Sequence, residues 1–272
     1  MQPSQEEILA ALGHYRDRIR QHNRVVFERF VQHAEAAKPQ KPMGAHRISE
    51  ARQKFMYNLL YVSRPEMLNP ALRINEPADV LANWDDFVQT FGLDGVYIHR
   101  TDHQEQLRAA YKSGIEAGLR RIESDVGFPT DFDVLMGHVD SLNGHGWPKY
   151  RAEGQQVRFW DGTGESQDEV ADRVYGGDDA LLDKTGLNYW DGPYGWKVAA
   201  GWECGMGPET TCFVVYCQHE ESGKEWAWRY VAERGQYGVD VFDNVVEMLQ
   251  WYEILYMPPL DDRLDCFMSN IF

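Results

Sequence analysis

Apolar residues recur every three or four positions through the first thirty residues, which is the spacing of one face of an α-helix. The stripe consists of Ile8, Leu12, Tyr15, Ile19, His22, Val26 and Phe30. Ser4 and Glu7 stand three residues apart just before the stripe, as the two side chains of a capping box do. We therefore predict a long first helix that begins near Ser4, with His22 packed in the core that covers its apolar face.

Two more helices are predicted before residue 127. One spans residues 49–62 and stops before Pro65, because proline disfavours the helical conformation of the residue that precedes it. The other opens at Thr101 and Gln104, which repeat the capping-box spacing, and carries apolar residues at helical intervals up to Gly127. Glycine readily adopts the positive φ that ends many helices, so we predict that conformation at Gly127.

The segment 119–144, LRRIESDVGFPTDFDVLMGHVDSLNG, has a break between two apolar stripes. Gly127 comes shortly before Pro129, and proline suits the first turn of a new helix. Asp131 and Asp133 favour the positive end of the dipole of that helix. The second stripe consists of Phe132, Leu135, Val139 and Leu142 and is closed by Asn143 and Gly144. We predict two helices hinged at residues 127–129.

Beyond residue 144 the hydrophobic pattern alternates with a period of two, which indicates strands. Strands are predicted at residues 157–160, 196–200, 211–217 and 225–232. A short turn joins the last two, which we expect to pair as a hairpin. Trp226, Trp228 and Tyr230 would share one face of it, with the two tryptophans buried against a final helix. That helix is predicted over residues 243–256, with Asp243 as its cap.

The hinge at residues 127–129 and the segment 242–249 resemble sequences of the SUKH superfamily. That superfamily includes fungal cell-wall-assembly regulators of the Smi–Knr type and bacterial toxin-immunity proteins. The resemblance covers about residues 105–256 and implies an α+β fold, a twisted antiparallel sheet packed by helices. It also implies non-catalytic protein binding, by a regulator or scaffold or by an immunity protein.

The resemblance does not cover residues 1–100. We therefore expect residues 1–100 to form an N-terminal helical extension and residues 101–272 to form the SUKH-like domain. The extension favours the larger fungal type of architecture over the compact immunity proteins.

The formal net charge of the chain is −16, and it is unevenly distributed. Residues 1–60 carry a net charge of +4, so the remainder carries −20. Residues 161–191 contain nine carboxylates and two basic residues among several glycines, and we expect this run to form an acidic surface insertion. Such a field repels nucleic acid and favours a basic protein as partner.

The apolar runs and the cysteines of the sequence indicate the cellular compartment. No apolar run is long enough to cross a bilayer, and the N-terminus lacks the apolar core and cleavage site of a signal peptide, so no membrane partner is expected. The four cysteines have no paired metal-binding spacing, and Cys212 and Cys217 lie in an apolar run typical of buried free thiols. We expect a protein of the reducing cytoplasm, of undetermined oligomeric state.

Three sets of residues could in principle bind a metal or transfer protons. His138, Asp140 and His145 are close in sequence, but positions two apart on a helix face different directions. His99 and His103 have helical spacing, but a cap at Thr101 would put His99 outside the helix. The acidic run could bind calcium, yet it lacks the spacing of an EF-hand loop. We therefore expect no metal and no cofactor.

Known catalytic motifs are also missing: there is no nucleophile elbow, phosphate-binding loop, zinc-protease motif or dinucleotide fingerprint. We therefore assign no catalytic residue. An enzyme acting on a carbohydrate or nucleotide, with carboxylates in an aromatic-lined cleft, stays open as the alternative, because carboxylate pairs leave no sequence signature.

Five aromatic residues between positions 189 and 202 could be core or interface, and the pattern does not separate the two. Tryptophan and tyrosine are favoured at protein interfaces. The hypothesis is that the acidic run steers a basic partner and that neighbouring aromatics anchor it. The candidate partner-binding residues are Asp178, Asp179, Asp183, Tyr189, Trp190, Tyr194 and Trp202.

Overall fold

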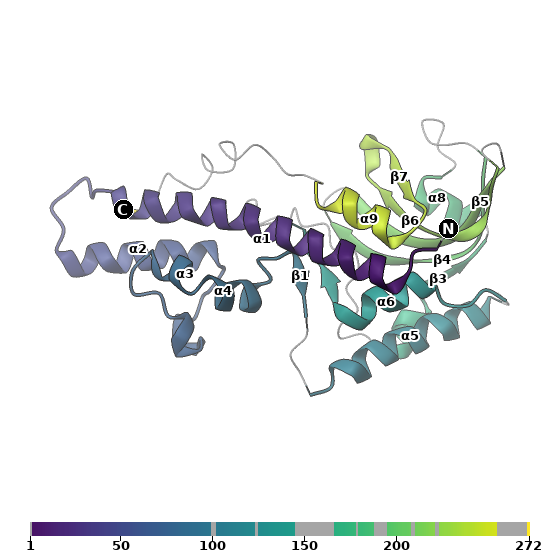
Figure 1. Cartoon of the computed structure of the whole chain (residues 1–272), viewed down its shortest axis with the longest axis horizontal. Helices are drawn as coiled ribbons and strands as arrows, with labels where there is room; N and C mark the ends of the chain where they lie inside the picture. Colours follow the sequence, from purple (N-terminus) through teal and green to yellow (C-terminus); the bar gives the residue numbers. More distant parts are fainter. Residues whose placement is uncertain are drawn as a thin grey trace. The chain divides into compact units, whose positions relative to one another are not determined.

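A computed structural model shows a chain of helices and antiparallel sheets, which confirms the predicted α+β class (Figure 1). The structure describes residues 2–98, 102–122, 125–144, 166–177, 179–187, 195–207, 210–220, 223–254 and 271–272. The predicted strand at residues 157–160 lies outside these ranges.

The chain divides into two compact units. Unit 1 comprises Met1–His14, Val96–Gly144 and Gln155–Tyr252, and unit 2 comprises Tyr15–Gly95, His145–Gly154 and Glu253–Phe272. The change at residues 95–96 lies close to the predicted boundary at residue 100. The division is not sequential, however, because the first fourteen residues group with unit 1 and the C-terminal residues with unit 2.

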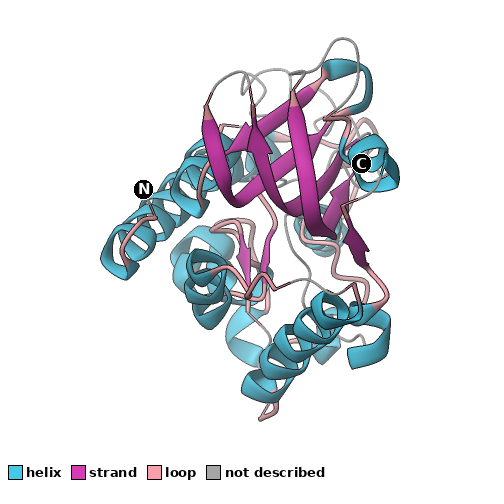
Figure 2. Cartoon of the chain, turned by 90° about the vertical axis from the view of Figure 1, so that its right-hand side faces the viewer, coloured by secondary structure: helices cyan, strands magenta, loops and turns pink. Residues whose placement is uncertain are grey.

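A five-stranded antiparallel sheet is the centre of unit 1, and its order follows the sequence, β3-β4-β5-β6-β7. The strands are β3 (Val174–Gly176), β4 (Trp196–Gly207), β5 (Thr210–His219), β6 (Lys224–Glu233) and β7 (Val239–Phe242). The predicted hairpin is confirmed, with Tyr216 opposite Trp228 and Val214 opposite Tyr230. The sheet is twisted (Figure 2), as the handedness of the chain requires.

Helices cover both faces of the sheet. Side chains alternate along each strand, so Phe213 and Val215 of β5 point to the face that meets Leu181 of α8 (Asp179–Thr185). We call this the α8 face. The opposite face, here the α6 face, meets Phe132 of α6 (Thr130–His138), whose ring contacts those of Trp202 and Tyr230. The final helix, α9 (Val245–Tyr252), also contacts α6.

Two glycines let another pair of helices approach closely. α5 (Gln104–Arg121) packs against α7 (Gln167–Ala171) and β3. A Cβ atom added to Gly114 would lie 2.8 Å from the carbonyl oxygen of Gln167. One added to Gly118 would lie 2.5 Å from Cγ2 of Val174 and 2.7 Å from the carbonyl oxygen of Ala171. Any larger residue at position 118 must therefore displace backbone.

A two-stranded sheet completes the described part of unit 1. It pairs β1 (Val96–Tyr97) with β2 (Ser141–Leu142). Next to it, the buried carboxylate of Asp140 accepts hydrogen bonds from Arg108 Nε (2.6 Å) and Gln104 Nε2 (2.9 Å). This ion pair ties α5 to the end of α6, and a buried pair is costly to break.

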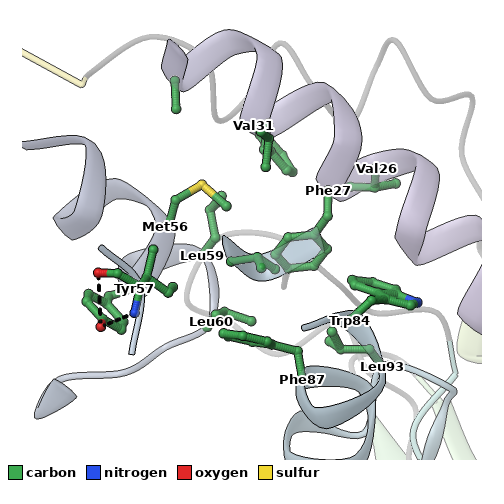
Figure 3. Close-up of a cluster of buried hydrophobic side chains, with 14 of the residues drawn as sticks. Val26, Phe27, Val31, Met56, Tyr57, Leu59, Leu60, Trp84, Phe87 and Leu93 are labelled. Carbon is green, nitrogen blue, oxygen red and sulfur yellow. Dashed lines mark hydrogen bonds between the residues drawn. The ribbon is translucent and has the colours of Figure 1, made fainter. Parts of the chain in front are cut away.

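Unit 2 has a helical core, in which α1 (Gln5–Ala36) supplies one wall. Figure 3 shows Phe27 pointing from α1 toward Leu60 and Trp84, and the rings of Phe27 and Trp84 lie 5.7 Å apart. Tyr57 closes another side, since its hydroxyl accepts a hydrogen bond from the backbone N–H of Ile74 at 2.7 Å. The other elements of this unit are α2 (Ala45–Leu59), η1 (Pro65–Met67), η2 (Pro70–Leu72), α3 (Asp79–Ala82) and α4 (Trp84–Phe91).

The capping box predicted at the start of α1 is confirmed. Ser4 and Glu7 form a reciprocal capping box, with Glu7 N to Ser4 Oγ at 3.3 Å and Ser4 N to Glu7 Oε2 at 2.7 Å. The predicted stripe is buried except for His22, which is only half-buried, so its assignment to the core was wrong. Asn23 is fully buried instead, because its Nδ2 donates to the carbonyl oxygen of Leu93 at 2.8 Å.

The predicted hinge exists, but its details were wrong. α5 ends at Arg121 and α6 begins at Thr130, so no helix runs through residue 127. Pro129 is the N-cap of α6 rather than a residue of its first turn. Gly127 does not have a positive φ, and a Cβ atom there would meet nothing within 4 Å. Gly127→Ala should therefore cost little, whereas the positive φ predicted from the sequence would have made it destabilising.

Two helix N-caps in the structure also differ from those predicted from the sequence. The N-cap of α5 is His103, so the helix begins later than the Thr101 spacing indicated, and Thr101 lies outside the described residues. At α9 the capping oxygen belongs to Asn244, whose Oδ1 accepts from Glu247 N at 3.0 Å, rather than to Asp243. Asp243 is used in ion pairs instead, which the local pattern does not reveal.

The end of α2 is held by a residue in the left-handed conformation. Tyr61 has φ of +56° and is the one described non-glycine residue with positive φ. Val62 N donates to the carbonyl oxygen of Tyr57 at 2.9 Å, which closes the helix as a Schellman motif does. A Cβ atom is disfavoured in this conformation, so the position stores strain.

We predict that Gly118→Ala destabilises unit 1 although alanine is the better helix former. The overlap with Val174 and with the backbone of Ala171 should cost about 1–3 kcal/mol, more than the ~1 kcal/mol that helix propensity contributes. Gly13→Ala in α1 is the matched control, since a Cβ there meets nothing within 4 Å, and it should stabilise. Urea denaturation measures both, and equal stabilisation by the two changes would contradict the packing argument.

Tyr61→Gly should raise the free energy of unfolding by up to about 1 kcal/mol, because glycine adopts positive φ without strain. Tyr61→Ala removes the same side chain but keeps the strained backbone, so it should not stabilise. Thermal unfolding of the two variants separates strain from side-chain loss. A more stable alanine variant would show that the tyrosine ring, not φ, sets the cost.

Candidate functional site

A buried carboxylate connects the elements of the α6 face. Asp131, in the first turn of α6, is 2% exposed. Its Oδ1 accepts from the hydroxyl of Tyr230 (2.8 Å) and from Phe132 N (3.0 Å), and its Oδ2 accepts from Val245 N (3.0 Å). The N-termini of α6 and α9 and the middle of β6 therefore meet at one side chain.

Tyr230 is held as a neutral hydrogen-bond donor in this arrangement. Burial, together with the neighbouring Asp131 carboxylate, raises the pKa of the Tyr230 hydroxyl well above its usual value. The proton that Tyr230 donates to Asp131 is thus kept throughout the physiological pH range.

A ladder of aromatic rings crosses the sheet beside this carboxylate. The successive ring centroids are 5.8 Å apart for Phe128 and Trp202, 5.4 Å for Trp202 and Trp228, and 5.4 Å for Trp228 and Tyr216. Tyr216 then stacks on Trp226 at 5.6 Å and 20°. Exposure changes along the ladder, from 0% at Trp202 and 7% at Trp228 to 39% at Trp226.

The inner end of the ladder is fixed by hydrogen bonds. Trp202 Nε1 donates to Tyr111 Oη at 3.1 Å, and Trp228 Nε1 donates to the carbonyl oxygen of Gly127 at 2.8 Å. The ammonium of Lys112 lies 5.5 Å from the ring centroid of Phe128. The Tyr216–Trp226 stack, in which Trp226 is exposed and Tyr216 half-buried, therefore projects from a rigid base, and we call this stack the aromatic surface.

Ion pairs brace the same hairpin on the α8 face. Arg229 is 5% exposed, donates from Nε to Asp243 at 2.8 Å and lies over the ring of Trp196. Lys224 donates to the same carboxylate at 2.6 Å. Burial of the Asp243 carboxyl is outweighed by these hydrogen bonds and charges, which lower its pKa.

The described cysteines are buried free thiols, as predicted for Cys212 and Cys217. Burial raises the pKa of Cys217 to about 11 and that of Cys212 further. Such thiols are poor nucleophiles. They therefore serve as small apolar core residues.

The net negative charge belongs entirely to unit 1. Unit 1 carries 12 Lys and Arg residues against 28 Asp and Glu residues, whereas unit 2 carries 15 of each. The formal charges of the two units are thus −16 and 0. The aromatic surface lies in the charged unit.

The structure places few of the predicted partner-binding residues together. Asp183 is exposed on α8, and Asp179 is the first residue of that helix. Asp178, Tyr189, Trp190 and Tyr194 lie outside the described residues. Trp202 is fully buried and cannot contact a partner, so its assignment as a binding residue was wrong.

Trp226 was missed as a surface residue. Its alternation with Trp228 and Tyr230 predicted a shared buried face, and Trp228 and Tyr230 are indeed buried. Strand periodicity assigns a face but not the extent to which helices cover it. Trp226, close to the turn of the β5–β6 hairpin, is exposed on the same face.

The metal hypotheses find no support in the described part of the chain. Asp140 is occupied by Arg108 and Gln104, and His99 and His145 lie outside the described residues. Among the residues that can be described, no group of three or more His, Cys, Asp or Glu side chains could hold a metal. Nor does any helix within those ranges have the length and apolarity that a membrane span requires.

Unit 2 contains a separate, open hollow of about 270 Å³. It is lined by Arg24 and by residues 81–86, and Asp85 in its wall is ion-paired with Arg20. No family model, curated protein or solved structure matches the chain.

We predict that Asp131→Asn destabilises unit 1 by about 3 kcal/mol or more, because an amide nitrogen would face backbone donors at a buried site. Tyr230→Phe removes only one of the three hydrogen bonds and should cost about 1–2 kcal/mol. Urea denaturation followed by tryptophan fluorescence measures both. Equal costs would mean that the hydroxyl, rather than the carboxylate, holds the elements together.

Proposed function

We propose that the chain is a non-catalytic protein-binding module whose acidic unit 1 attracts a basic protein. The observation that supports this most is the segregation of charge, with −16 on unit 1 and 0 on unit 2. A concentrated field of one sign raises the association rate of an oppositely charged partner. Trp226 and Tyr216 then offer the kind of ring surface that anchors interfaces.

The biological role we favour is that of a regulator or scaffold, as the resemblance to the Smi–Knr type implies. A toxin-immunity protein is the alternative, and both would act on protein partners rather than on nucleic acid, whose phosphates the negative field repels. The buried free thiols support a reducing, cytoplasmic environment.

Neutralising the acidic run should slow association with the partner. A partner is first recovered with the full chain as bait, and its association rate is then measured at about 50 and 300 mM NaCl, where screening differs strongly. We expect the triple variant D178N/D179N/D183N to associate more slowly than the wild type at low salt, with little change in dissociation or fold. Added salt should reduce the difference.

A matched control neutralises three exposed carboxylates of unit 2, with E35Q/E50Q/E66Q. This variant should associate at the wild-type rate. Association that is insensitive to salt, or equally fast in the acidic-run variant, would refute steering. Turnover of a carbohydrate or nucleotide that is lost in D178N/D179N/D183N would instead support the enzyme alternative.

A further inference from the structure

Trp226 ends the aromatic ladder at the solvent. It is 39% exposed and lies flat on Tyr216, with an angle of 20° between the rings. The bonded and buried rings of Trp228 and Trp202 support this stack from below. A ring that is already held in place loses little conformational freedom when a ligand covers it, which favours binding.

Trp226 belongs to unit 1, which carries the whole formal charge of −16. The two lysines on the neighbouring strand ends are both ion-paired, Lys197 with Glu220 and Lys224 with Asp243. Glu225, which directly precedes Trp226, is exposed as well, but neighbouring residues of a strand point to opposite faces, so its carboxylate belongs to the α8 face.

The chain itself repeatedly places cations over aromatic rings. Arg229 lies 5.3 Å from the ring centroid of Trp196 on the other face of this hairpin, and Lys184 lies 4.9 Å from that of Tyr175. Trp226 is a more exposed ring than these, and no cation from the described residues covers it. Trp is the ring that attracts cations most strongly.

We propose that the Tyr216–Trp226 stack binds an arginine side chain of the basic partner. This inference rests on the proposed function and names the contact that follows steering. Arginine is favoured over lysine because its guanidinium is planar, stacks on indole and is less strongly hydrated. The formal charge of −16 on unit 1 would offset the bound charge.

The test uses two blocked peptides, hexa-arginine and hexa-citrulline, titrated calorimetrically into the full chain at low salt. Citrulline keeps the planar shape of arginine but has no charge. We expect hexa-arginine to bind and hexa-citrulline not to bind. Trp226→Ala should weaken hexa-arginine binding at least about threefold, and Trp226→Phe should weaken it less, since phenylalanine retains a weaker cation–π interaction.

Tyr237→Ala is the matched control, because Tyr237 is an exposed aromatic (56%) of η3 (Gly235–Tyr237), outside the aromatic surface. It should bind hexa-arginine as the wild type does. The indole N–H resonance of Trp226, identified by its loss in Trp226→Phe, should shift when hexa-arginine is added. This measurement does not depend on how well the alanine variant folds.

Several outcomes would overturn the arginine site: no hexa-arginine binding by the wild type, equal binding of both peptides, an unmoved Trp226 resonance, or unchanged affinity in Trp226→Ala. If D178N/D179N/D183N weakens binding while Trp226→Ala does not, steering stands and the anchor is wrong. If only Trp226→Ala weakens binding, the anchor stands and steering by the acidic run is wrong.

Discussion

The buried carboxylate of Asp131 is the interaction on which unit 1 depends. It accepts hydrogen bonds from a strand tyrosine and from backbone at the starts of two helices. The positive ends of both helix dipoles point toward it, which favours an acidic side chain at this position. Because α6, α9 and β6 meet at one atom group, losing it releases all three elements rather than one contact.

That arrangement determines which aromatic residues are core and which are surface. α6 brings Phe132 onto Trp202 and Tyr230 and leaves the hairpin tip beyond its reach. From Trp202 through Trp228 to Trp226 the rings therefore pass from fully buried to exposed. A rigid, graded support of this kind lets Trp226 remain at the surface without disorder, which is the property that an interface anchor needs.

Charge and shape act at different ranges in the proposed binding. The field of unit 1 acts over about a Debye length, roughly 8 Å at physiological ionic strength, and affects encounter. The aromatic surface acts only at contact and affects the lifetime of the complex. Unit 2, with balanced charge and its own core, adds little to the field.

Periodicity and local chemistry in the sequence were sufficient to determine the capping box of α1, the β5–β6 hairpin, the break between α5 and α6 and the α+β class. These features depend on residues within a few positions of one another. Only the tertiary structure decided that Gly127 needs no special φ, that Asn244 caps α9 while Asp243 binds Arg229, that Trp202 is core and that Trp226 is not. Each of these depends on which distant element covers a residue, and burial by distant elements leaves no trace in local spacing.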